Sequence, residues 1–253
     1  MDFSVAVVVA TFILATTAIA LVVLTASRKR AAKEDDLKRA AATRGWTFES
    51  TSARGYRVHR WTGTTEGVPW QAESLRYTSG NNRQRRPNLA RWHGDFSPGV
   101  TAPLVCVGMP PGKEIPAFSA AQDNSLLAKL AIKAAGFAFD KAIDVYFSDV
   151  VGKQVDGAAM HRVDTKLPGF IVMAVNRDEA ARILSQGLER SLTDALHDPS
   201  SVFAKDDRPW VLLMPHGISL ARTGQFRDLA DIDSFVRAGL ALTRSSKFAR
   251  PFA

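Results

Sequence analysis

Cysteine is almost absent from the sequence, which has Cys106 and no other. A single cysteine cannot form an internal disulfide framework, and this fits a cytoplasmic domain. There is no Cys-x-x-Cys and no His-Glu-x-x-His motif, and the five histidines lie too far apart to indicate a local metal site. These absences exclude the zinc-dependent classes that carry such motifs, and we predict no metal and no cofactor.

Catalytic motifs are absent as well. Residues 110–114 (PPGKE) approach a phosphate-binding loop but lack its first glycine and its Ser/Thr, so they predict a turn after a strand. A nucleophile and a base could still assemble in space from Cys106, His59 or His93. Because Cys106 lies in an apolar run, its thiol is expected to be buried and unreactive. We therefore predict no catalytic residue.

Charge is missing from one long stretch, Phe3 to Ala26, which Arg28, Lys29 and Arg30 follow. A helix of about 20 apolar residues crosses a bilayer, so residues 1–27 predict a transmembrane anchor. The alternative is a cleaved secretory signal. Such a signal has a basic leader and a shorter apolar core, whereas the leader here is Met1-Asp2.

The basic residues predict the orientation of that anchor. Lys and Arg flanking a span stay in the cytoplasm, and here they all follow it. The predicted location is the bacterial inner membrane, single-pass, with the N-terminus outside. Residues 28–45 predict a juxtamembrane helix, with Gly45 at its C-terminal cap.

The net charge of +8 comes from two short segments, whereas residues 92–253 carry as many acidic as basic side chains. One segment is the juxtamembrane helix. The other is an arginine-rich loop that we predict to face lipid, the alternative being a solvated loop. Basic segments near a membrane attract anionic headgroups, so the predicted partners are the lipid bilayer and an unknown protein, not nucleic acid. The loop arginines are Arg83, Arg85, Arg86 and Arg91.

Residues 46–253 predict one α+β domain. Alternating apolar residues between 46 and 96 indicate an antiparallel meander, with Trp61, Trp70 and Trp92 in its core. Apolar runs at 103–109 and 169–175 predict buried strands, and Pro215-His216-Gly217 predicts a hairpin. Helical spacing predicts amphipathic helices at 124–135, from Asn176 to before Pro199, and at 228–243. The predicted fold class is thus a transmembrane helix followed by a domain with a mainly antiparallel sheet and about three amphipathic helices.

This order of elements resembles uncharacterised bacterial single-pass membrane proteins with a cytoplasmic domain of unknown function. The resemblance rests on residues 44–46 (RGW), 169–172 (GFIV), Arg177-Asp178 with Ala180-Ala181 and Leu184, and Trp210 with the hairpin after it. These are packing residues, and the resemblance implies no catalytic residue.

Two functions remain open at this point. The first is a membrane-tethered cytoplasmic binding or scaffolding module, which fits the anchor, the basic loop and the missing motifs. The alternative is a membrane-anchored enzyme, for example a hydrolase, whose site is assembled from dispersed residues.

Overall fold

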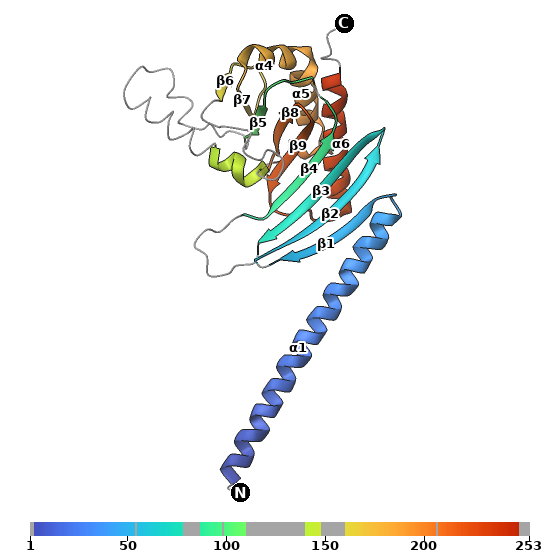
Figure 1. The fold of residues 1–253 in the computed structure, drawn as a ribbon, viewed down its shortest axis with the longest axis vertical. Coiled ribbons are helices and arrows are strands. Elements are labelled where there is room, and N and C mark those ends of the chain that lie inside the picture. The colour runs from blue at the N-terminus through green and yellow to red at the C-terminus, as the bar shows by residue number, and fades with distance from the viewer. Residues whose placement is uncertain are drawn as a thin grey trace, which may run out of the picture. The chain divides into compact units, whose positions relative to one another are not determined.

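A computed structural model gives the fold of the chain (Figure 1). It describes residues 3–53, 55–77, 87–97, 99–109, 140–147, 160–205 and 207–247, with the side chains of the N-terminal helix described from residue 21. The chain divides into two compact units, Met1–Phe48 and Glu49–Ala253.

The first unit is a single helix and the turn after it. Helix α1 (Phe3–Ala42) is 40 residues long, so the predicted helix at 28–45 forms its C-terminal part. Gly45 has φ +71°, a conformation that glycine adopts easily, and its N–H donates to the Ala42 carbonyl oxygen. The Arg44 guanidinium lies 5.6 Å from the centre of the Trp46 ring. These contacts end the helix and begin the chain's turn toward the first strand.

The predicted membrane anchor is contradicted. Within the described part of the chain, no helix combines the length and the hydrophobicity that crossing a bilayer requires. Three predictions are therefore wrong: the fold class that began with a transmembrane helix, the single-pass membrane assignment and the inner-membrane location. The α+β content agrees with the prediction.

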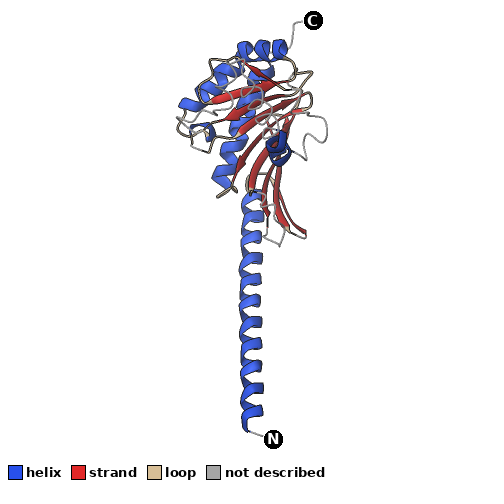
Figure 2. Cartoon of the chain, turned by 90° about the vertical axis from the view of Figure 1, so that its left-hand side faces the viewer, coloured by secondary structure: helices blue, strands red, loops and turns tan. Residues whose placement is uncertain are grey.

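The second unit is built on a sheet to which nine described strands contribute. Figure 2 shows that this sheet is strongly curved. The strand order is β1-β2-β3-β4-β9-β8-β5-β7-β6, and each pair from β2 onward is antiparallel. The strands are β1 (Thr47–Ala53), β2 (Tyr56–Thr65), β3 (Val68–Tyr77), β4 (Leu89–Asp95), β5 (Leu104–Gly108), β6 (His161–Val163), β7 (Phe170–Ala174), β8 (Trp210–Met214) and β9 (Gly217–Thr223).

The predicted meander corresponds to β1–β4, and the predicted buried strands correspond to β5 and β7. The predicted hairpin is the β8–β9 pair, with Met214 opposite Gly217. The remaining order could not be predicted, because β4 pairs with β9 across more than 120 residues.

The described helices after the first strands are α4 (Arg177–Ile183), η3 (Leu184–Leu188), α5 (Glu189–His197), the short η4 (Val202–Ala204), residues 140–147, and α6 (Leu229–Lys247). The predicted helix at 228–243 is α6. The helix predicted after Asn176 is broken by the π-turn η3, where Gly187 has φ +133°. The helix predicted at 124–135 lies outside the described residues.

Asn176 caps the N-terminus of α4 with only one half of a capping box. Asn176 Oδ1 accepts a hydrogen bond from the Glu179 N–H at 3.1 Å, as in a capping box. The Glu179 carboxylate, however, accepts from the Thr101 N–H at 2.7 Å and the Ala102 N–H at 3.2 Å. Glu179 thus ties α4 to the segment before β5.

One face of the sheet packs against α6. A Cβ on Gly239 of α6 would lie 2.2 Å from the Trp92 ring, so the helix touches the sheet there. The rings of Trp61, Phe226 and Phe235 follow one another edge to face, with centroids 6.0 and 5.1 Å apart. Trp61, Trp70 and Trp92 are all at most 3% exposed, which confirms the predicted tryptophan core.

The opposite face packs against the helix at residues 140–147. Its Ile143 and Phe147 belong to an apolar cluster with the neighbouring strands β5, β7, β8 and β9. Tyr146 stacks on Trp210 of β8, with ring centroids 4.7 Å apart. This cluster covers the sheet from β7 to β9, and the polar residues described next lie on the same face, toward β2.

Candidate functional site

A row of polar side chains crosses four adjacent strands on the face opposite α6. Side chains alternate between the faces of a strand, and Trp92 points toward α6, so Arg91 and His93 point to the other side. The register places Glu73 opposite Arg91, Arg60 opposite Glu73, and Ser219 opposite His93. We call the following set the polar row: Arg60 of β2, Gln71 and Glu73 of β3, Arg91, His93 and Asp95 of β4, and Ser219 of β9.

Glu73 is the centre of one half of the polar row. Its carboxylate accepts hydrogen bonds from Arg60 Nε, Gln71 Nε2 and Arg91 Nη2, each at 2.9 Å. The Arg91 side chain is 6% exposed and that of Glu73 is 11% exposed, whereas Arg60 is 43% exposed. A buried carboxylate needs such donors to offset its lost hydration. The network therefore holds Arg60 in place at the surface.

His93 is the centre of the other half. Its Nδ1 lies 2.8 Å from Ser219 Oγ, and its Nε2 lies 2.8 Å from Asp95 Oδ1. Ser219 is 2% exposed, whereas the Asp95 side chain is 71% exposed and that of His93 27%. The arrangement is a serine–histidine–carboxylate chain that runs from the interior to the surface.

A small cavity lies between the two halves. Its volume is about 20 Å³, and Gln71, Glu73, Arg91, His93 and Ser219 line it together with Phe147 from the neighbouring apolar cluster. A cavity of about 10–15 Å³ already holds one water molecule, so this one has room for a water or for a similarly small group.

Arg91 does not lie in the arginine-rich loop. It belongs to β4, is buried, and pairs with Glu73, so its predicted contact with lipid is wrong. Arg83, Arg85 and Arg86 lie outside the described residues, and a lipid partner for them stays a prediction. Arg28 and Lys29 are exposed on α1, and the side chain of Arg30 lies outside the described residues.

The structure does not bring Cys106 together with a histidine. Cys106 lies in β5 and His59 in β2, with four strands between them, or about 24 Å at a strand spacing of about 4.8 Å. His93 points to the opposite face of the sheet from Cys106. Cys106 is fully buried, and burial raises the pKa of its thiol to about 12. The thiol is therefore not a nucleophile at neutral pH.

Most of the polar row was not predicted from the sequence. Of its seven members, His93 was named as a candidate base and Arg91 was assigned to the loop. The spacing of His93 and Asp95, two residues apart in a strand, is a signal that could have been read, because such residues share a face. Ser219 carries no such signal, since its pairing with His93 joins strands 126 residues apart.

A metal centre has no support in the described part of the chain, where no three His, Cys, Asp or Glu side chains are grouped to hold an ion.

Comparisons with protein-family models, with curated proteins and with solved structures found no match. The resemblance to the bacterial membrane proteins therefore stays a prediction, and function is argued from the polar row.

Proposed function

We propose that the second unit is a protein-binding module that uses the exposed end of the polar row. The observation that carries this proposal is the fixed position of Arg60. Its guanidinium is bonded to Glu73 at 2.8–2.9 Å and lies 4.0 Å from the Glu49 carboxylate, yet the side chain is 43% exposed.

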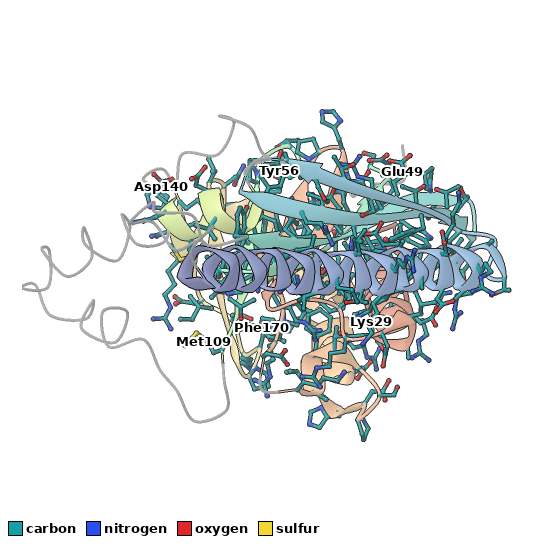
Figure 3. All side chains as sticks on the ribbon, turned by 90° about the horizontal axis from the view of Figure 1, so that it is seen from below. Lys29, Glu49, Tyr56, Met109, Asp140 and Phe170 are labelled. Carbon is teal, nitrogen blue, oxygen red and sulfur yellow. The ribbon has the colours of Figure 1, made fainter. Side chains whose placement is uncertain are left out.

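A charged side chain that is already held in place costs little further entropy when a partner binds. Arginine is also the basic residue most enriched at binding hot spots. Glu49 of β1 and Tyr56, four residues before Arg60 on β2, are also exposed (Figure 3), at 68% for the Glu49 side chain and 40% for Tyr56. A tyrosine and paired charges favour a polar protein surface as the partner.

The test is site-specific photocross-linking in cells that express the full chain. A benzoylphenylalanine at Thr62, two residues from Arg60 on the same face of β2, is expected to give a discrete adduct. In the matched control, the benzoylphenylalanine replaces Arg237, which is exposed on α6. The partner identified from the adduct is then purified, and its affinity for the intact chain is measured by calorimetry.

Arg60→Gln is the variant that decides the proposal. It is expected to weaken binding about tenfold or more, a hot-spot effect, while thermal unfolding shows that the sheet is intact. Binding by the wild type should also weaken with added salt, because exposed charges are screened. Equal adducts from Thr62 and Arg237, or unchanged affinity in Arg60→Gln, would contradict the proposal.

A further inference from the structure

We propose that Ser219, His93 and Asp95 form a catalytic site that hydrolyses small acyl esters, of which acetyl esters are the type. This activity goes beyond binding, since it breaks a covalent bond. It rests on the two contacts of 2.8 Å that join Ser219 Oγ to His93 Nδ1 and His93 Nε2 to Asp95 Oδ1.

The hydrogen-bond chemistry fixes the direction of these contacts. A carboxylate only accepts hydrogen bonds, so His93 Nε2 carries the ring hydrogen and donates it to Asp95. In neutral imidazole the other nitrogen, Nδ1, then has a free lone pair, and the Ser219 hydroxyl donates to it. Asp95 thus sets the tautomer in which His93 is ready to take the serine proton. This is the division of roles in a serine–histidine–aspartate triad, with the two ring nitrogens exchanged.

The sheet holds these groups in register. His93 and Ser219 are direct cross-strand partners on β4 and β9, and Asp95 stands two residues beyond His93 on the same face. Gly217 leaves room for the His93 ring, because a Cβ there would lie 2.6 Å from His93 Cε1. Backbone pairing therefore positions the base, the nucleophile and the carboxylate together.

The cavity beside Ser219 defines the substrate class. Its volume of about 20 Å³ is only a little above the roughly 10–15 Å³ that one water needs, so the cavity limits the acyl group to the smallest size. Acetyl is among the smallest acyl groups, whereas a long acyl chain exceeds this limit. Arg91 lines the same cavity together with its partner Glu73, and its side chain is the hydrogen-bond donor that would stabilise the carbonyl oxygen as it becomes negative in the transition state.

The reaction uses only the ester and water. Ser219 Oγ forms a bond to the ester carbonyl carbon while its proton moves to His93 Nδ1, and the carbonyl π electrons move to the oxygen. Collapse of this intermediate breaks the bond to the alcohol oxygen, which leaves with the proton from His93. Water then attacks the acyl-serine in the same way, His93 passes its proton to Ser219 Oγ, and the carboxylic acid is released. Ser219 and His93 are the catalytic residues, and Asp95 is a positioning residue.

The first experiment adds 4-nitrophenyl acetate to the full chain, stops the reaction with acid, and locates the trapped acetyl group by mass spectrometry. This acetyl label is expected on Ser219. Ser74→Ala is the matched control, because Ser74 is also a buried strand serine, at 6% exposed, but lies on the opposite face and should leave labelling unchanged. Absence of label on Ser219 in the folded wild type overturns the proposal.

The second experiment compares hydrolysis of 4-nitrophenyl acetate and 4-nitrophenyl octanoate. Ser219→Ala is expected to lower kcat/KM for the acetate at least 100-fold, and His93→Gln should do the same with the fold retained. Asp95→Asn should lower kcat and leave KM unchanged, which a purely structural role would not do. Acetate hydrolysis that persists in Ser219→Ala, or a preference for octanoate, overturns the proposal.

Discussion

Arg222 shows how a single charged side chain is kept in the interior of this domain. It is 3% exposed, pairs with Asp231 of α6, lies 3.5 Å from Asp207, and stands 5.0 Å from the centre of the Phe235 ring. Removing one partner of a buried pair leaves an uncompensated charge. Arg222→Met is therefore expected to lower the free energy of unfolding by about 3–5 kcal/mol, measured by urea denaturation.

An exposed pair provides the control for Arg222. Arg244 pairs with Glu66, and the two side chains are 59% and 50% exposed. Arg244→Met should change the free energy of unfolding by at most about 1 kcal/mol, because exposed ion pairs contribute little. Equal losses in the two variants would contradict the role given to burial.

Cys106 gives a pH-dependent prediction. Burial raises the pKa of its thiol from 9.0 to about 12, so the unfolded chain loses the proton at lower pH than the folded chain. The stability that follows from this difference is complete below pH 9 and falls as pH rises from 9 to 12, by about 1.4 kcal/mol per pH unit. Between pH 8 and pH 10 the wild type should lose about 1.4 kcal/mol more than Cys106→Ala in urea denaturation. Identical losses would show that the thiol ionises alike in both states.

The burial of a single side chain could be predicted where it depends on the residues next to it in the sequence. The burial of the three core tryptophans follows from alternation along their own strands, and the burial of the Cys106 thiol follows from the apolar run around it. Arg91 was misplaced because its carboxylate partner, Glu73, stands on another strand, and only that pairing makes a buried arginine tolerable.

At the scale of elements, the contact between α6 and the sheet depends on glycine. Gly239 and Gly94 lie against the Trp92 ring, where an added Cβ would come within 2.2 and 2.5 Å of ring atoms. Helix propensity alone would make Gly239→Ala stabilising by about 1 kcal/mol. The clash reverses this sign, and we expect the variant to be about 1–3 kcal/mol less stable in urea denaturation.

A double-mutant cycle separates the clash from other effects of Gly239→Ala. In a Trp92→Phe background the smaller ring leaves space, so the same change should cost less than in the wild type. An equal cost in both backgrounds would mean that the contact with Trp92 does not limit how closely α6 approaches the sheet.

Helices, strands and turns could be predicted where they depend on the spacing of nearby residues in the sequence. The Pro215-His216-Gly217 turn, the buried strands β5 and β7, and helix α6 were all predicted within a few residues. The π-turn in the helix after Asn176 was not, because the apolar spacing continues through Gly187 without interruption. The hydrogen bonds of the Glu179 carboxylate were also missed, since its partners Thr101 and Ala102 lie 78 and 77 residues away.

At the scale of the whole molecule, composition misled the prediction of a membrane anchor. The charge-free run suggested a separate span, but residues 3–42 form one helix, and the described part of the chain holds no helix that meets the length and hydrophobicity of a span. The arginine excess likewise suggested one exposed loop, although Arg91 belongs to the sheet interior. Net charge along the chain does not reveal which cations are paired in the fold.

The last prediction concerns the independence of the second unit. Among the described side chains, every buried apolar residue except Ala41 belongs to Glu49–Ala253. Because burial of apolar surface is the main favourable term in folding, a fragment of residues 44–253 should carry the stability of the domain. We expect it to unfold in one transition, with a free energy of unfolding within about 1 kcal/mol of the corresponding transition in the full chain, and to be unaffected by EDTA. Calorimetry and urea denaturation of both chains measure this. A broad transition in the fragment, or a loss of several kcal/mol, would show that residues before 44 contribute to the core.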